Sequence, residues 1–186
     1  MLIGFTGAQS TGKSTLLKQM SIDDSFRKCS FVKEVTRKVA ARGLDINDQG
    51  TTLTQLFILN EHLNNHTLHE KCTVLDRCII DGYIYTKYLH ETKRVDDWVL
   101  EYATHLRNYI ASRIDVLLYT DPEDVKLVDD GVRSVDQQFR TRIIELYDEF
   151  LSDEKLLLNI MPVTKIVKLS GDVSQRMNQI KQSINL

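Results

Sequence analysis

The chain contains 186 residues, a length that suits one domain with a substantial hydrophobic core. Its 24 basic and 26 acidic residues give a formal net charge of -2, so no global basic field draws the protein to nucleic acid, although a local groove can still be basic. No apolar run approaches the roughly 20 residues that a membrane span needs, and the first predicted strand starts at Met1 with no signal peptide before it. We therefore expect a soluble, cytoplasmic protein that binds no membrane.

Three cysteines, Cys29, Cys72 and Cys78, lack the paired spacing of a metal site. Their odd number argues against a disulfide framework. We therefore expect them to be buried free thiols in a reducing compartment.

The first predicted element is a buried strand formed by the apolar run from Met1 to Thr6, and a glycine-bounded segment follows it directly. This segment, Gly7 to Thr15, reads G-A-Q-S-T-G-K-S-T and matches G-x-x-x-x-G-K-[ST], the phosphate-binding P-loop. Glycines let backbone N–H groups turn inward around phosphate oxygens, and the helix predicted from Thr15 adds the positive end of its dipole. An incidental turn between a strand and a helix is the alternative interpretation.

We predict that this segment binds the phosphates of ATP. Lys13 is expected to reach the β- and γ-phosphates, and the Ser14 hydroxyl is expected to coordinate Mg2+. The residues predicted to contact the nucleotide are Gly7, Gln9, Ser10, Thr11, Gly12, Lys13, Ser14 and Thr15.

Strands and helices are predicted to alternate along the rest of the chain. The other predicted strands cover residues 29–33, 72–75, 114–119 and 165–169. The predicted helices cover residues 36–42, 54–70, 80–90, 96–112, 136–151 and 173–184. This order predicts an α/β fold in three layers, with helices on both faces of a parallel sheet, in a single domain that spans residues 1–186.

Glu34, Asp76 and Asp121 each follow a predicted strand, at the sheet edge where ligands bind in such folds. Asp76 is interpreted as a Walker-B carboxylate that binds Mg2+ directly or through water; a surface aspartate is the alternative. Arg77 beside it has a guanidinium suited to clamping a phosphate or a substrate oxygen. Glu34 is either the general base for the acceptor hydroxyl or a carboxylate that favours the start of a helix.

A polar segment before the helix predicted at 136–151 is interpreted as an arginine-bearing lid at about residues 121–140. It contains Val-Asp-Asp-Gly-Val-Arg-Ser at 128–134, and Arg140 and Arg142 follow it. An arginine such as Arg133, brought over the γ-phosphate on closure, would neutralise developing charge and exclude water. A solvated, turn-rich loop is the alternative.

Two further patterns are interpreted as structural. His62, His66 and His69 recur on one face of the predicted helix 54–70, but no carboxylates complete a metal site with them. Aromatic residues of the predicted helix 96–112 are expected in the core rather than in a base-stacking platform. They are Trp98, Tyr102 and Tyr109.

These segments together resemble the P-loop nucleoside and nucleotide kinases, and in particular the nicotinamide riboside kinase domain of bifunctional bacterial NAD-biosynthesis regulators. The resemblance covers most of the chain and rests on Gly7–Ser14, Glu34–Arg37, Val74–Asp76, Asp115–Leu118 and Val128–Ser134. It implies a thymidylate kinase-like parallel sheet with the strand order 2-3-1-4-5. The Asp76-Arg77 pair is more similar to that of thymidylate and polynucleotide kinases, and small kinases of this type also occur in bacteriophages.

We predict roles at the positions that match these kinases. The predicted catalytic residues are Lys13, Glu34, Asp76 and Arg133. The predicted substrate-binding residues are Glu34, Arg37, Arg77, Asp130 and Arg140, and the predicted Mg2+ ligands are Ser14 and Asp76.

The leading hypothesis is an ATP-dependent kinase that transfers the γ-phosphoryl group to a hydroxyl of a nucleoside-like small molecule, with nicotinamide riboside as the first candidate. The alternative acceptor is a nucleotide or a hydroxymethylated pyrimidine in DNA, bound at a basic groove with Lys33, Arg37, Lys38 and Arg42. A GTPase or ATPase switch is disfavoured because the chain has neither an Asn-Lys-x-Asp nor an Asp-x-x-Gly motif. The sequence leaves open the acceptor, the choice between ATP and GTP, and the oligomeric state.

Overall fold

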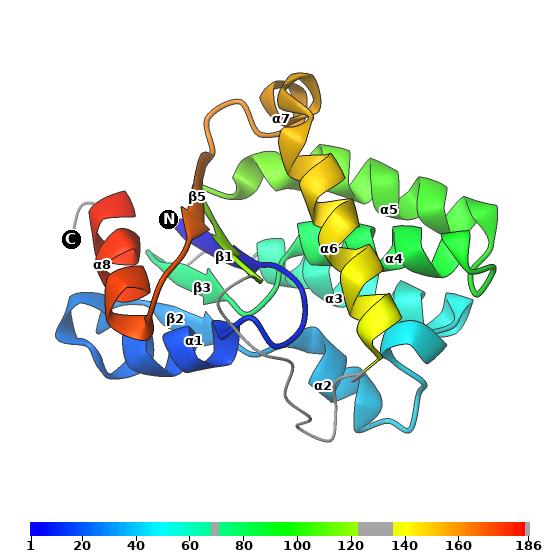
Figure 1. Ribbon diagram of the computed structural model, residues 1–186, viewed down its shortest axis with the longest axis horizontal. Coiled ribbons are helices and arrows are strands. Elements are labelled where there is room, and N and C mark those ends of the chain that lie inside the picture. The colour runs from blue at the N-terminus through cyan, green and yellow to red at the C-terminus, as the bar shows by residue number, and fades with distance from the viewer. Residues whose placement is uncertain (68–70, 123–135, 185–186) are drawn as a thin grey trace.

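The computed structural model describes residues 1–67, 71–122 and 136–184. Its centre is a five-stranded parallel sheet in the order β2-β3-β1-β4-β5 (Figure 1). The strands are β1 (Leu2–Thr6), β2 (Ser30–Val32), β3 (Thr73–Leu75), β4 (Val116–Thr120) and β5 (Lys165–Leu169). The predicted fold class and strand order are confirmed.

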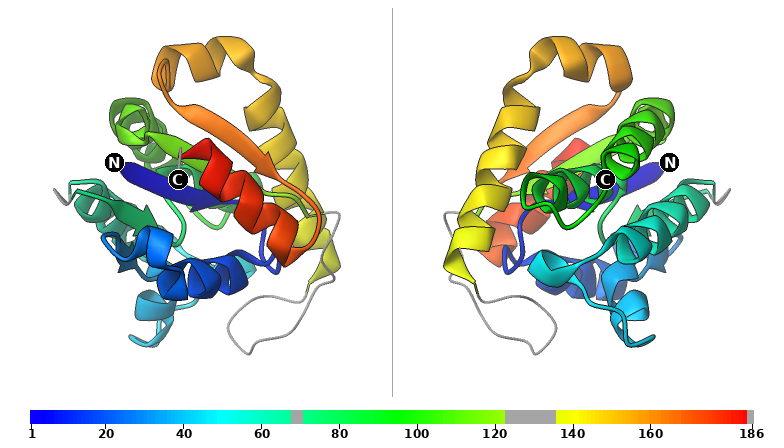
Figure 2. Two further views of the ribbon diagram at one scale, coloured as in Figure 1. Left: turned by 90° about the vertical axis from the view of Figure 1, so that its left-hand side faces the viewer. Right: turned by 90° about the vertical axis from the view of Figure 1, so that its right-hand side faces the viewer.

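Helices cover both faces of this sheet (Figures 1 and 2). They are α1 (Lys13–Ile22), α2 (Val35–Ala40), α3 (Thr52–His66), α4 (Ile79–Glu91), α5 (Asp97–Ile110), α6 (Gln137–Ser152), α7 (Glu154–Ile160) and α8 (Val173–Ser183). The short helix α7 was not predicted from the sequence. Within the described parts of the chain, no helix combines the length and the apolar character needed to cross a membrane.

The three central strands, β1, β3 and β4, are buried on both faces because their side chains alternate between two cores, whereas the edge strands β2 and β5 are partly exposed. Ile3 and Phe5 of β1 belong to the core that α1 and α8 complete, whereas Leu2 belongs to the larger core formed with α3 to α6. Leu118 and Leu117 of β4 divide between the two cores in the same way. A shift of one residue would exchange these faces, so burial fixes the register and aligns the carboxyl ends of the strands at one edge.

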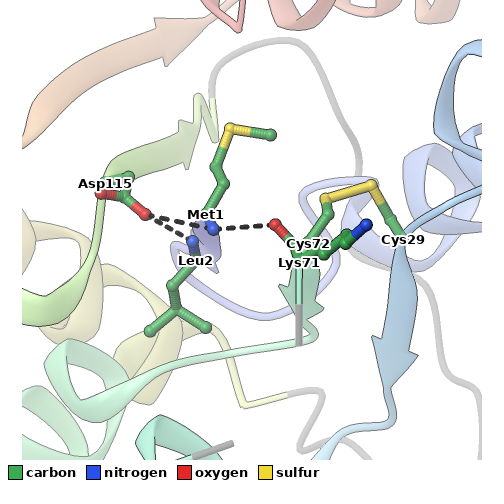
Figure 3. Close-up of a disulfide and its surroundings, with 6 residues drawn as sticks. All are labelled: Met1, Leu2, Cys29, Lys71, Cys72 and Asp115. Carbon is green, nitrogen blue, oxygen red and sulfur yellow. Dashed lines mark hydrogen bonds and ion pairs between the residues drawn. A yellow bond between two sulfur atoms is a disulfide. The ribbon is translucent and has the colours of Figure 1, made fainter. Parts of the chain in front are cut away.

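The prediction of free thiols is wrong for two of the three cysteines, because Cys29 and Cys72 form a disulfide (Figure 3). These cysteines directly precede β2 and β3, whose parallel register pairs Ser30 with Thr73. The two cysteines are therefore neighbours, with their Cα atoms 4.5 Å apart. Counting cysteines could not reveal this adjacency, which is a property of the sheet register. Cys78 is buried and keeps a free thiol, as expected.

The buried face of α5 also differs from the predicted one. The side chains of Trp98 and Tyr109 are 51% and 75% exposed, so the expectation that they lie in the core is wrong. Val99, Ala103 and Ile110 form the buried face instead. The two sets differ by one position along the helix, and packing against α3 and α4 selects the aliphatic set.

Candidate active site

The segment between β1 and α1 has the backbone conformation of a phosphate-binding loop. Gly7, Ser10 and Gly12 have φ angles of 135°, 55° and 88°, and Gly12 directly precedes the first turn of α1. A Cβ atom at Gly7 would lie 2.6 Å from the Thr120 hydroxyl oxygen, so only glycine lets the loop pass this close to the end of β4. The loop therefore wraps around the amino end of α1, where the positive end of the helix dipole favours an anion.

Lys13 lies inside this loop rather than in solvent. Its side chain is 1% exposed, and Nζ donates hydrogen bonds to the Gly7 carbonyl at 2.8 Å, the Ala8 carbonyl at 2.5 Å and the Thr11 hydroxyl at 3.0 Å. These neutral oxygens hold the ammonium group against the concave side of the loop. A phosphate entering the loop would offer this ammonium group charged oxygens, which form stronger hydrogen bonds than carbonyls do.

Ser14 and Asp76 have the chemistry required of magnesium ligands. Ser14 is exposed in the first turn of α1, and Asp76 is half-buried directly after β3, the strand that neighbours β1. The Asp76 amide donates to the Val32 carbonyl at 2.9 Å, which anchors this position at the carboxyl edge of the sheet. A hydroxyl and a carboxylate are the hard oxygen donors that Mg2+ prefers, usually together with water and phosphate oxygens. The two residues therefore fit this ion.

A narrow pocket, partly open to solvent, lies beside the phosphate loop. Residues from the β2–α2 junction, α3 and α4 line it: Glu34, Thr36, Asn47, Gln55, Ile58, His62, Arg77, Asp81, Gly82 and Tyr85. Two hydrogen bonds connect these walls to the loop. Arg77 Nη1 donates to the Gly7 carbonyl at 3.2 Å, and the Tyr85 hydroxyl donates to Gln9 Oε1 at 3.2 Å.

Arg77 organises the buried charges of this pocket. Its Nε donates to Glu34 Oε1 at 2.7 Å and its Nη1 donates to Asp81 Oδ1 at 2.8 Å, while the Tyr85 ring lies 5.1 Å from the guanidinium carbon. Burial acts to lower the pKa of Arg77, but Tyr85 and the two carboxylates outweigh it and raise the pKa well above its usual value. Asp81 is further held by the Tyr147 hydroxyl, which donates to Oδ1 at 2.9 Å.

The backbone at Arg77 is strained to make this arrangement. Its φ angle is 75°, in the left-handed region that a residue with a Cβ atom rarely adopts. Such strain persists only where surrounding contacts hold it, and it is concentrated at functional sites. Here the contacts are the hydrogen bonds and ion pairs of the Arg77 side chain with Glu34, Asp81 and Gly7.

This geometry agrees with the result of comparison with known families. The sequence model of a family described as an AAA domain matches residues 2–176. The chain belongs to this family.

Three solved structures are similar in fold to this AAA domain. A deoxyadenosine kinase from M. mycoides with products dCMP and dCDP has a TM-score of 0.72 and 17% identity, covering 100% of this chain and 98% of that one. A NadR protein in complex with NR has a TM-score of 0.73 and 19% identity, covering 100% of this chain and 52% of that one. Thymidylate kinase from Candida albicans has a TM-score of 0.63 and 19% identity, covering 99% and 90%. The comparison of this sequence with curated proteins found no match.

The histidines of α3 have structural contacts in this AAA domain. His66 Nε2 accepts a hydrogen bond from the Ile79 amide, the first of α4, at 3.2 Å. His62 packs on Gly82, where an added Cβ atom would lie 3.0 Å from the imidazole. Burial lowers the pKa of His62 to about 4 and that of His66 to about 3, so both are neutral at physiological pH. His69, the third histidine of the pattern, lies outside the described residues.

Of the arginines predicted at the site, besides Arg77, one contacts the pocket wall, one lies on α6 and one lies outside the described residues. Arg37 is 45% exposed and forms an ion pair at 3.3 Å with Glu34, a residue of the pocket wall. Arg140 is buried on α6, where Nη2 donates to the Pro122 carbonyl at 3.2 Å. Arg133 and Asp130, with most of the predicted lid, lie outside the described residues, so their roles stay predictions.

Sequence reasoning missed several residues of the pocket. Asp81 follows Arg77 by four positions, a spacing that brings opposite charges together on a helix and could have suggested the pair. Gln55 and Tyr85 carry no such signal, because Gln55 is one of many polar residues on α3 and Tyr85 is one of three tyrosines on α4. Asp121, noted at the end of β4, pairs with Lys168 at 2.8 Å.

Proposed function

We propose that this AAA domain is an ATP-dependent kinase that transfers the γ-phosphoryl group to a hydroxyl of a nucleoside-like small molecule, with nicotinamide riboside as the first candidate. The observation that carries the proposal is the direct connection between the phosphate loop and the neighbouring pocket. Gly7 and Gln9 of the loop accept hydrogen bonds from Arg77 and Tyr85 of the pocket wall. ATP bound in the loop and a phosphoryl acceptor bound in the pocket would therefore be adjacent, and this proximity is the main requirement of phosphoryl transfer.

The residues of the loop and pocket suit separate parts of this reaction. Loop amides and Lys13 would bind the triphosphate and stabilise charge on the transferring group. Mg2+, held by Ser14 and Asp76, would neutralise phosphate charge. Glu34 would orient the acceptor hydroxyl and take its proton, since it is a buried carboxylate on the pocket wall whose position Arg77 fixes. Arg133 would add a second cation to the transferring group, as the sequence predicts.

The helix-start interpretation of Glu34 receives less support. Glu34 is the N-cap residue of α2, but its side chain makes no capping hydrogen bond. Its carboxylate instead points to two guanidinium groups, with Arg77 at 2.7 Å and Arg37 at 3.3 Å. A residue that served only to start the helix would bond the amides of the first turn.

Two neighbours in fold bear on the acceptor. One is described in complex with NR and another with the products dCMP and dCDP, so both hold compounds with a nucleoside-like part. The pocket beside the loop offers neutral polar groups, including Asn47 and Gln55, that suit the edge of a planar base. These points support a nucleoside-like acceptor without distinguishing one base from another.

The test is an acceptor screen with radiolabelled ATP and Mg2+. The panel contains nicotinamide riboside, the common nucleosides, their 5′-monophosphates and duplex DNA with hydroxymethylated pyrimidines. We expect product with a free nucleoside, and a loss of rate in Glu34→Gln that the control Glu61→Gln on the surface of α3 does not share. Transfer only to DNA, with steep salt dependence, would favour the DNA acceptor. No product with any member would contradict the proposal.

A further inference from the structure

Arg176 on α8 joins three segments of the chain at the back of the phosphate loop. Its side chain is 3% exposed, and its guanidinium donates to three main-chain carbonyls. Nη1 bonds Thr11 in the loop at 2.8 Å, Nη2 bonds Asp121 after β4 at 3.2 Å, and Nε bonds Gly171 before α8 at 2.9 Å. We propose that Arg176 is a positioning residue that holds the phosphate loop in its nucleotide-binding shape. This inference rests on the proposed nucleotide site.

The contact with Thr11 determines the orientation of one peptide group. The peptide between Thr11 and Gly12 is trans, so its carbonyl and its N–H lie in one plane and point in opposite directions. Arg176 fixes the carbonyl on the α8 side, and the Gly12 N–H must then point away from α8. Amides of this kind bind phosphate oxygens in a glycine-bounded loop.

Thr11 is anchored from its side chain as well. Its hydroxyl donates to the Ala8 carbonyl at 2.9 Å and lies 2.6 Å from the Thr120 hydroxyl. The side chain thus fixes Thr11 toward the loop and β4, while Arg176 fixes its carbonyl toward α8. With both anchors in place the peptide plane has little freedom to rotate, so the loop does not have to be ordered when the nucleotide binds.

The planar guanidinium is required for this contact pattern. Its N–H groups diverge in one rigid plane and can reach three carbonyls from different segments at once. A lysine ammonium carries the same charge on a flexible stem but lacks this fork. Arg176→Lys therefore removes the geometry and keeps the charge, which separates positioning of the loop from simple attraction of the nucleotide.

Gln179 provides a matched control on the same helix. Its side chain accepts from the Ser170 amide at 3.1 Å and donates to the Ser170 carbonyl at 3.2 Å. These two bonds fasten α8 to the turn after β5, as Arg176 does through Gly171, but they do not involve the phosphate loop. Gln179→Ala therefore tests whether fastening α8 is sufficient.

The experiment is titration calorimetry of the full chain with two probes, Mg-ATP and Mg-tripolyphosphate. We expect Arg176→Lys to bind both probes about 10-fold to 100-fold more weakly than the wild type, since a hydrogen bond to a charged group is at stake, and Gln179→Ala to bind both within about 3-fold. Equal losses for the two probes would support positioning of the phosphate loop, because tripolyphosphate has no base. Circular dichroism confirms that each variant is folded at the assay temperature.

Three results would overturn the inference. A folded Arg176→Lys with wild-type affinity for both probes would show that Arg176 is structural only, and so would an equal loss in Gln179→Ala. Weaker binding of Mg-ATP with unchanged binding of Mg-tripolyphosphate would mean that Arg176 acts on the base. If Arg176→Lys does not fold, Arg176→Gln, which keeps two amide N–H donors but not the charge, replaces it with the same expected loss. A wild type that binds neither probe would instead refute the proposed function itself.

Discussion

Removal of the Cys29–Cys72 disulfide should destabilise the protein by about 4 kcal/mol. The bridge joins residues 43 positions apart and so closes a loop that contains β2, α2 and α3. The chain-entropy relation for a closed loop of this size gives about 13 cal/mol/K, or about 4 kcal/mol at 25 °C. The folded state keeps its other restraints, because the Ser30 amide still donates to the Cys72 carbonyl at 2.9 Å. The loss of stability therefore arises mainly because the unfolded chain gains conformational freedom when the disulfide is absent.

The assay is urea unfolding of the wild type and of Cys29→Ser, each with and without dithiothreitol. For a denaturant slope of about 2 kcal/mol/M, the midpoint of the oxidised wild type should fall by about 2 M on reduction. Cys29→Ser has no bridge to reduce, so its midpoint should match the reduced wild type and should not respond to the reagent. Thiol titration of the unfolded, unreduced wild type should find only Cys78. A wild-type midpoint that ignores the reagent, with the bridge verified, would refute the loop-entropy reasoning.

Three other perturbations probe the site and its supports. Lys13→Met keeps the buried stem but removes the ammonium, so calorimetry should show about 100-fold weaker Mg-ATP binding, and unchanged binding would contradict the role of the loop. Asp81→Asn leaves a buried guanidinium short of a partner and should cost about 3–5 kcal/mol in chemical unfolding, whereas Asp97→Asn, in an ion pair whose carboxylate side chain is 94% exposed, should cost less than about 1 kcal/mol. His62 and His66 have pKa values lowered by burial to about 4 and about 3, below the ordinary 6.5, so the unfolded state binds more protons as the pH falls. Their stabilising contribution is complete above about pH 6.5, and unfolding free energy should drop by about 2–3 kcal/mol from pH 7.5 to 5.5, with His66→Gln removing about half of the drop. A flat profile over that range would contradict the burial of both imidazoles, and half of the expected drop would show that one of them is solvated.

The parts of the fold that the sequence predicted are those determined by local patterns. The strand predicted at 165–169 coincides with β5 (Lys165–Leu169), and the helix predicted at 173–184 matches α8 (Val173–Ser183), whose N-cap Asp172 accepts the Gln175 amide at 2.9 Å. Each depends on a few adjacent residues, an apolar run in one case and a capping side chain in the other. The sheet order needed the family resemblance as well, since alternation alone permits several orders of parallel strands.

The failures concern properties that depend on distant segments. On α5, the sets containing Trp98 and Val99 are both apolar at helical spacing, and only the neighbouring helices decide which one is buried. For Cys29 and Cys72, the deciding fact is a register between strands that are 43 residues apart. Neither the buried face of α5 nor the register of β2 and β3 can be read from a short stretch of adjacent residues.

The candidate site shows the same division. The position of Glu34, Asp76 and Arg77 at the sheet edge was predictable because they follow strands, and the carboxyl ends of parallel strands meet at one edge. The role of Arg77 needed the structure. Its donors reach Glu34, Asp81 and the Gly7 carbonyl, so its demonstrated contacts shape the pocket, and a clamp on a substrate oxygen stays a prediction. Asp81 comes from α4, and its approach depends on how that helix packs on the sheet.

The Gly7 carbonyl explains why the loop and the pocket form one unit. It accepts hydrogen bonds from Lys13 Nζ at 2.8 Å and from Arg77 Nη1 at 3.2 Å, so one backbone oxygen contacts the cation of the loop and the cation of the pocket. A Cβ atom at Gly7 would collide with Thr120, and β4 thus fixes the position of that oxygen. In the proposed reaction, the spacing between donor phosphate and acceptor hydroxyl would then be built into the sheet edge. A protein catalyses phosphoryl transfer mainly by positioning the reactants and by electrostatic stabilisation. In the proposed reaction, this positioning would need no rearrangement of Glu34 or Arg77.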